Sequence, residues 1–443
     1  MIDGMKKLAQ GAIAKAGGDV ELSGSRSEDF QVSAFRGEIS QYSRSKSAGW
    51  SARAIDGRKL GTAYTEKGTP EALAEAAASA VRNAAFMDDD EGNALADTTG
   101  ELSFTIGERS GWLDGDAAKE FALRLEKTCK GIDPRVVNVP DSSYGTGMSA
   151  SVVATGRGLF RGLVQRYGYA YTYLMVSDGA ETEIGFELQV VRDPARLDLE
   201  FIAREAVRKG VERLGAEEPK SGHPRCVMQN DAASGLIGAF LGNVSAESMQ
   251  KGISKLAGRR GQKVGCDEFT VIDDPEAPGF GKAPFDDEGI DSPRIAIFDK
   301  GVFAEPLYTI YSARREGARP NGRGFRASIK SRASAGIINA FIPDGSETPA
   351  DILECAWDGI LITDLEGLHA GLDEVSGDFS CAAKGFTIES GKRGRAIKNF
   401  TVSGNFYTLV QAIVARANDR RTDTNASFSS PSLLIQSLAV SGR

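Results

Sequence analysis

The sequence predicts an α+β fold in two domains: an N-terminal domain of helices and antiparallel sheet over residues 1–215, and a strand-rich, barrel-like C-terminal domain over residues 225–443. Alanine-rich amphipathic stretches and segments with a period of two both occur, which are the patterns of helices and strands. Glycine is frequent, at 52 of 443 residues, as in chains with many hairpins and tight turns. The segment 215–224 is polar and contains glycine and proline, which makes it the best candidate for the domain boundary.

The first elements of the chain follow from local signals. Residues 3–16 form an amphipathic pattern and predict a helix, and turn-punctuated extended segments then continue to about residue 65. Thr69-Pro70 opens a predicted helix over residues 70–86, because threonine accepts backbone donors as the N-cap and proline suits the first helical position. The acidic, glycine-containing stretch 88–100 is predicted to be a linker.

The same order of elements then recurs. A helix is predicted near residues 115–131, strands over 135–191, and a second helix near 195–213. This recurrence indicates an internal duplication of the N-terminal domain.

Two runs in the second copy have a period of two, so each run lies on one face of a strand. The runs are Tyr167, Tyr169, Tyr171, Tyr173 and Ile184, Phe186, Leu188, Val190. A row of tyrosines is a surface on which a peptide can lie, because each ring offers apolar area and a hydroxyl. A half-buried sheet face is the other interpretation, and the general frequency of aromatic residues in strands favours it.

The C-terminal domain is predicted to begin with a helix that Asp231 caps. Its apolar stripe is Leu236, Ile237, Phe240, Leu241 and Val244. Short strands and turns follow beyond residue 265, with a hairpin over 294–308. Two further helices are predicted, one opened by Thr348-Pro349 and one over roughly 404–417.

Bulk composition restricts the class of protein. The net charge of −8 opposes sequence-independent binding to nucleic acid, which needs a basic field. No secretory signal and no run of 18 apolar residues is present. The five cysteines occur singly, as in reduced cytosolic proteins. We therefore expect a cytoplasmic protein without a membrane anchor, and its two histidines limit the available chemistry.

Several spaced motifs carry a family resemblance. Residues 267–275 read Asp-Glu-Phe-Thr-Val-Ile-Asp-Asp-Pro, 284–289 read Pro-Phe-Asp-Asp-Glu-Gly, 376–380 read Ser-Gly-Asp-Phe-Ser, and Ser-Ser-Pro-Ser opens the motif at 429–442. In this order they resemble the TldD/PmbA family, and in particular its PmbA (TldE) branch. The resemblance implies a two-domain α+β fold and a role in bacterial peptidase complexes, and some members of the family were also named modulators of DNA gyrase.

The zinc motif of the family is missing. In its peptidase branch an HExxxH helix follows the domain boundary, but the corresponding residues 234–243 read Ser-Gly-Leu-Ile-Gly-Ala-Phe-Leu-Gly-Asn. The peptidases also use a late cysteine, and the corresponding residues 423–427 read Asp-Thr-Asn-Ala-Ser. Because a zinc hydrolase needs about three protein ligands, we expect no catalytic residue, no metal ligand and no cofactor.

Other catalytic patterns are not supported. His369 with Cys381 lacks the context of a cysteine protease, and no GxSxG elbow occurs. The stretch 385–392 has the wrong spacing for a phosphate-binding loop, and the glycines after residue 144 precede a strand rather than a helix.

Two charged clusters remain as candidate sites. Asp286, Asp287 and Glu288 could bind a cation or the amino terminus of a peptide, but an acidic loop whose carboxylates accept backbone hydrogen bonds is favoured. The second cluster is a basic patch formed by Arg314, Arg315, Arg319, Arg323 and Arg326. We expect it to meet a partner protein, because arginine is enriched at interfaces and few aromatic residues accompany it.

The leading hypothesis is a non-catalytic subunit, inactive by itself, that completes a chamber for unfolded peptides around a zinc-bearing TldD-like homologue. A regulatory protein that binds DNA gyrase without proteolysis is an alternative, and a free-standing hydrolase of unrecognised mechanism is another. A homodimer is left open.

Overall fold

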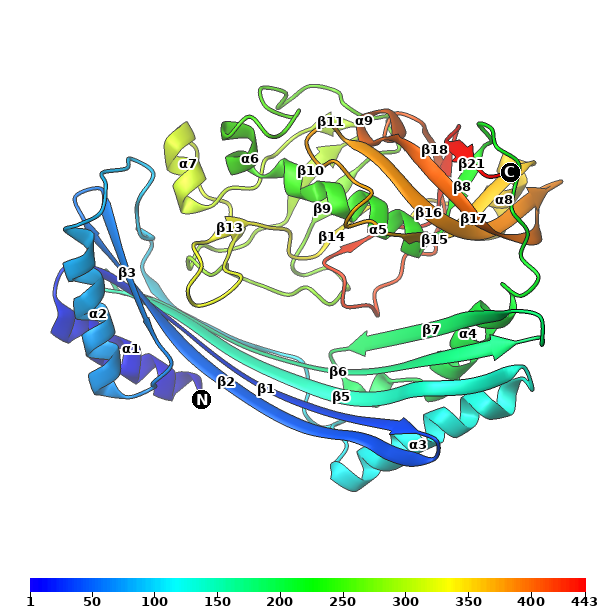
Figure 1. Cartoon of the computed structure of the whole chain (residues 1–443). Coiled ribbons are helices and arrows are strands. Elements are labelled where there is room, and N and C mark those ends of the chain that lie inside the picture. The colour runs from blue at the N-terminus through cyan, green and yellow to red at the C-terminus, as the bar shows by residue number, and fades with distance from the viewer.

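The computed structural model describes residues 1–443. A curved, largely antiparallel sheet dominates the N-terminal half (Figure 1). Its central path is β3 (Lys59–Thr65), β2 (Glu38–Asp56), β1 (Asp19–Phe35), β5 (Val136–Thr155) and β6 (Leu159–Ser177). Two further strands flank β6, namely the parallel strand β4 (Gly100–Ile106) along its first part and the antiparallel strand β7 (Thr182–Val191) along its second. β7 is therefore an edge strand.

Helices cover the outer side of this sheet. They are α1 (Ile2–Ala16), α2 (Pro70–Ala84), α3 (Gly115–Ile132) and α4 (Leu199–Val211), with a 3₁₀ turn at Pro194–Arg196 before α4. α1 packs against α2 at one end of the sheet and α3 against α4 at the other (Figure 1). The prediction at the start of α2 is confirmed, since the Thr69 hydroxyl accepts a hydrogen bond from the Ala72 N–H. A helix, three antiparallel strands and a helix occur twice in order, as expected for a duplication.

The two faces of the curved sheet differ in polarity. Leu22, Trp50 and Ala52 point outward into a core with α1 and α2. Their neighbours Ser23 and Ser51 point inward, where they line a small cavity together with Arg326 of the C-terminal half. Strands β1, β2 and β5 thus bury apolar side chains on the outer face and present mainly serine, glycine, aspartate and glutamine on the inner face.

The C-terminal half lies across the concave side of the sheet (Figure 1). One of its sheets has the order β18 (Ile413–Arg416), β20 (Leu433–Ile435), β8 (Cys226–Met228), β15 (Gly359–Glu366), β16 (Asp378–Glu389), β17 (Lys392–Asn405), β21 (Ala439–Ser441). The other has the order β11 (Val302–Phe303), β10 (Ile295–Asp299), β9 (Val271–Asp273), β14 (Ala340–Phe341), β19 (Phe428–Ser429). A small ladder joins β12 (Gly324–Phe325) to β13 (Ser334–Ala335).

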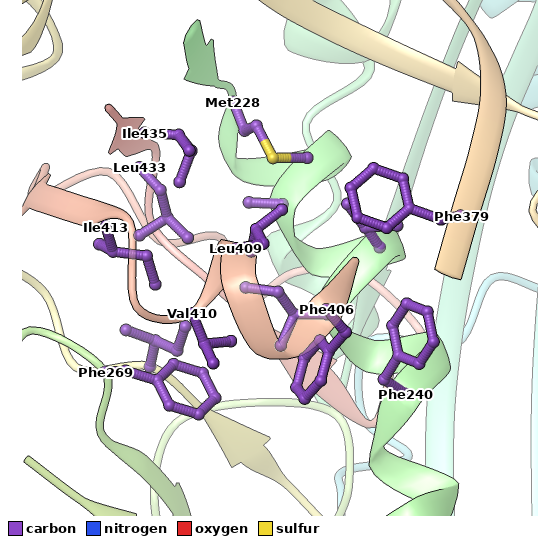
Figure 2. Close-up of a cluster of buried hydrophobic side chains, with 14 of the residues drawn as sticks. Met228, Phe240, Phe269, Phe379, Phe406, Leu409, Val410, Ile413, Leu433 and Ile435 are labelled. Atoms are coloured by element: carbon purple, nitrogen blue, oxygen red, sulfur yellow. The ribbon is translucent and has the colours of Figure 1, made fainter. Parts of the chain in front are cut away.

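The main helix of this half is α5 (Asn230–Phe240), which contacts β15 of one sheet and β19 of the other. Its apolar stripe enters the largest core, where Phe240 stacks on Phe406 at 4.8 Å between ring centroids. Figure 2 shows this core around Leu409 and Val410. The shorter helices are α6 (Ala246–Gln250), α7 (Ile310–Glu316), α8 (Pro349–Ala356) and α9 (Phe406–Leu409), with a 3₁₀ turn at Leu241–Val244.

Two local predictions for the C-terminal half are wrong. Residues 404–417 do not form one helix, because α9 ends at Leu409 and the chain then enters strand β18, which pairs with β20. Asp231 does not cap α5, whose N-cap is Gln229, so the Asp231 side chain is free to form ion pairs. The predicted hairpin is confirmed as β10 and β11. None of the helices has the length and apolar character needed to span a bilayer.

The two halves are joined at both ends of the curved sheet. At the α2 end, Arg326 donates to Glu21 of β1 at 2.7 Å. At the α4 end, Arg393 pairs with Glu212 at 2.9 Å, and Arg213 pairs with Asp364. Because both ends are held, the orientation of the C-terminal half over the middle of the sheet is fixed.

Candidate functional site

α5 faces the segment 421–429 across a polar pocket of about 460 Å³. Asn230, Asp231 and Ser234 line it from the helix, and Thr424, Asn425 and Ser427 line it from the segment, among others. Hydrogen bonds fix the two walls, since Ser430 N–H donates to the Ser234 hydroxyl at 2.8 Å and Asn230 Nδ2 donates to the Asp419 carbonyl at 2.7 Å. The two stretches singled out in the sequence therefore meet at one place.

Arg421 is the cationic group of this pocket. Its guanidinium pairs with Glu187 of β7 at 2.7 Å and with Asp423 at 3.1 Å, and it lies 3.8 Å from Asp231. Glu187 is only 1% exposed and also pairs with Lys209 of α4 at 2.7 Å. Burial opposes the charge of Arg421, but these carboxylates outweigh that effect and raise its pKa. The cluster fastens the pocket to the edge of the curved sheet.

A second, apolar pocket of about 560 Å³ lies beside the first. We call its floor, formed by Tyr167, Tyr169 and Tyr171, the tyrosine platform. The remaining lining residues are Phe186, Leu188, Val190, Phe280 and Asn425. Tyr169 lies opposite Val190 and Tyr171 opposite Leu188 in the ladder, so the two rows predicted from the sequence stand side by side on the concave face.

The rings of the platform lie flat across β5. A Cβ atom at Gly145 would overlap with the Tyr169 ring, and one at Gly147 would overlap with the Tyr167 ring, so these glycines make room for them. The phenol oxygens donate to Asp29, Gln31 and Asp141 at 3.4, 3.3 and 2.8 Å respectively. Burial raises the pKa of Tyr169 to about 12. The tyrosines are therefore neutral near pH 7 and present ring faces to the pocket.

Asn425 lines both pockets, so the apolar and polar pockets form one cleft between the curved sheet and the C-terminal half. The segment that carries it is attached to the sheet edge, because Val190 N–H donates to the Asp423 carbonyl at 2.7 Å. Sequence reasoning did not find Arg421 or Phe280 as members of a site, and it singled out Asn425 only as part of the stretch 423–427 that corresponds to the cysteine region of the family. No local pattern marks them, since only the fold brings them to β6 and β7.

Three family models match the chain. They describe the PmbA/TldA metallopeptidase C-terminal domain over residues 221–442, domain 1 over 20–84 and the central domain over 113–214. The chain belongs to the PmbA/TldD metallopeptidase family. The expected resemblance is thereby confirmed.

Relatives in this family align along the whole chain. The metalloprotease PmbA of Escherichia coli O157:H7 is 22% identical and covers 100% of this chain and 98% of its own. A crystal structure from Thermotoga maritima, named a putative modulator of a DNA gyrase, is 26% identical with a TM-score of 0.88 and full coverage of both chains. TldE from Thermococcus kodakarensis has a TM-score of 0.89 at 23% identity, covering 99% of this chain and 100% of its own, and shows the same α+β fold.

The family implies zinc, but the residues at this pocket do not fit it. From the motif stretch of α5, Ser234, Gly235 and Gly238 line the pocket, and the facing segment offers Thr424, Asn425, Ala426 and Ser427. No group of three histidine, cysteine or carboxylate side chains is arranged to hold a metal ion. The nearby carboxylates are turned to Arg421 and Lys209, so the positive charge here belongs to the chain itself.

The acidic cluster lies away from this cleft, at the α2 end of the joint between the halves. Asp286 accepts hydrogen bonds from the N–H groups of Glu288, Ile290 and Gly324 at 2.8–3.0 Å. Asp287 accepts from Arg326 N–H at 2.8 Å, and Glu288 accepts from Ile310 N–H at 2.7 Å. The three carboxylates therefore hold the surrounding backbone in place by accepting hydrogen bonds from its N–H groups.

The predicted basic patch requires a correction, because its members are not gathered on one surface. Arg323 is fully buried and pairs with Asp273 at 2.7 Å. Arg326 is buried against Glu21. Only Arg314, Arg315 and Arg319 are exposed. The sequence could not separate the two groups, since their carboxylate partners are distant along the chain.

Proposed function

We propose that the chain is a non-catalytic, peptide-binding subunit that completes a peptidase chamber around a zinc-bearing homologue of the same family. The observation that carries this proposal is the cleft itself. Its polar pocket lies at the position of the zinc motif in the peptidase branch of the family, but its residues do not form a ligand set for zinc. The tyrosine platform adjoins this pocket. A subunit of this kind supplies binding energy and orientation, and the partner supplies the reacting groups.

The substrate class is unfolded peptide and the compartment is the bacterial cytoplasm, both by resemblance. The cleft suits an extended chain because it is open, lies along the edge strand β7, and combines apolar ring faces with the amide of Asn425. A folded protein would have to unfold locally to reach the platform beneath the C-terminal half.

Zinc content and peptide cleavage test the proposal together. After dialysis the purified chain should hold no stoichiometric zinc, because a catalytic site needs about three protein ligands. Alone, it should cleave no disordered peptide. The mixture of this chain with a zinc-bearing homologue should cleave the peptide, and a chelator should abolish that cleavage. One zinc per chain, or cleavage by the isolated chain at the rate of the mixture, would contradict the non-catalytic role.

A second candidate function is a regulator that binds DNA gyrase without proteolysis, which the name of the Thermotoga maritima relative favours. This chain would then bind gyrase in the absence of any family partner, and the zinc-bearing homologue would not compete. Binding that survives removal of the homologue, with no effect of the chain on peptide cleavage, would select this function.

A further inference from the structure

The spacing of the tyrosine platform matches that of an extended peptide. Ring centroids of Tyr167 and Tyr169 are 6.3 Å apart and those of Tyr169 and Tyr171 are 6.4 Å apart. In an extended chain, side chains on the same face repeat about every 6.6 Å, from roughly 3.3 Å per residue. We propose that the platform selects peptide segments in which large apolar side chains occupy every second position. This inference rests on the proposed peptide-binding function and specifies its substrate.

The chemistry of the platform selects apolar side chains. Each phenol oxygen is already bound to a side chain of β1 or β5, so the groove receives ring faces rather than hydroxyls. No charged side chain lines the pocket. A charged peptide side chain placed here would lose water without gaining a partner, whereas leucine or phenylalanine would bury apolar area against the rings.

A second row of side chains makes the platform a groove. Phe186 is 45% exposed although it is large and apolar, and its ring centroid lies 6.2 Å from that of Tyr171. Phe280 closes the other end, where its ring meets Tyr167 edge-on at 5.4 Å. A bound strand would place alternate side chains between these walls, while its remaining side chains would point away from the sheet.

Asn425 provides the polar contact that an extended backbone needs. It is the only residue lining the apolar pocket without an apolar side chain, and its amide can both donate and accept. Because the same residue lines the polar pocket beside α5, a peptide held on the platform would lead toward that pocket. The platform thus sets which face of the peptide is presented further along the cleft.

Two uncharged peptides of identical composition test the register. In one, leucine and serine alternate over seven positions, and in the other the leucines are contiguous. Each carries the same fluorophore, and fluorescence anisotropy measures binding to the purified chain without its homologue. We expect the alternating peptide to bind about tenfold more tightly, since three leucines rather than two contact the three rings at once.

Variants locate the binding. Tyr169→Ala removes the central ring, and Gly145→Ala keeps every tyrosine but places a Cβ where the Tyr169 ring lies. Both should weaken binding of the alternating peptide about tenfold. Tyr42→Ala is the matched control, because Tyr42 is 48% exposed and lies near Gly115 of α3, on the outer side of the sheet. Circular dichroism establishes that each variant is folded.

Equal affinity for the two peptides, or unchanged affinity in both platform variants, would overturn this inference and leave the proposed subunit function intact. Failure of the proposed function has a different signature: the homologue would cleave peptides equally well with and without this chain. The two results are separate, because binding is measured on the chain alone and cleavage on the mixture.

Discussion

Asp286 and Glu288 show what single residues contribute at the joint between the halves. Both carboxyl groups are buried, and both approach Gly324, where a Cβ atom would lie 2.6 Å from Glu288 Oε2 and 3.2 Å from Asp286 Oδ2. Burial raises the pKa of Asp286 well above its usual value, and the neighbouring Glu288 raises it further. Burial also raises the pKa of Glu288, although Arg53 opposes this. Ionising both carboxyl groups at this joint therefore costs free energy.

A pH dependence follows from these directions. In the folded protein the pKa of both carboxyl groups exceeds the unfolded value of about 4. The protonated forms therefore contribute stability that is complete below pH 4 and is lost as pH rises through the folded-state pKa. Glu288→Gln removes one of the two charges and should reduce that loss, so the variant should gain stability relative to the native chain on going from pH 4 to pH 7. Chemical denaturation at both pH values measures this.

Glu354→Gln is the matched control, since Glu354 is exposed on α8 and should show no such gain. If the stability difference between Glu288→Gln and the native chain is the same at pH 4 and pH 7, Glu288 does not cause this pH dependence.

At the scale of elements, helices pack on the curved sheet through glycine contacts. α4 approaches β7 so closely that a Cβ atom at Gly185 would overlap with the Ala206 carbonyl. Gly210 of α4 lies at the same contact, because a Cβ atom added to it would be 3.3 Å from Gly185 N. This approach positions Lys209 to reach Glu187 of the same strand. The edge of the cleft thus depends on a contact that only glycine permits.

Gly185→Ala should therefore destabilise the protein by about 1–3 kcal/mol, because an added methyl group in a filled contact forces the helix outward. Gly11→Ala is the opposite case. Gly11 lies inside α1 with no atom within 4 Å of an added Cβ, and alanine should stabilise the helix by about 0.5–1 kcal/mol. Thermal unfolding of the two variants gives the comparison, and a shift of both in the same direction would contradict the packing argument.

At the scale of the whole molecule, two joints hold the C-terminal half over the curved sheet in addition to the pairs of Arg393 and Arg213 at the α4 end. Arg326 and Glu21 fasten one end, and Arg421 with Glu187 fastens the edge beside the cleft. The second joint contains the same segment that lines both pockets. The orientation of Asn425 over the tyrosine platform is consequently a property of the joined halves rather than of either half.

Arg421→Ala should loosen that joint. Glu187 is buried and would keep only Lys209, so we expect a loss of about 1–3 kcal/mol in the free energy of unfolding. Amide hydrogen exchange should accelerate in β7 and in residues 421–429, while the Arg326 joint stays protected. Arg395→Ala, which removes an exposed pair with Glu217, serves as the control and should change neither quantity. Exchange that accelerates evenly over the whole chain would argue against a local joint.

Local sequence determined much of this protein. The cap at Thr69 and the alternation of Tyr167 to Tyr173 depend on neighbours a few positions apart, so they could be recognised without the fold. Tertiary contacts decided the rest. Residues 410–416 became a turn and a strand because β20 offers hydrogen bonds to that strand, which a short apolar run cannot reveal. Arg421, Asn425 and Phe280 joined the site because folding lays distant segments on β6 and β7, and no sequence period encodes such a meeting.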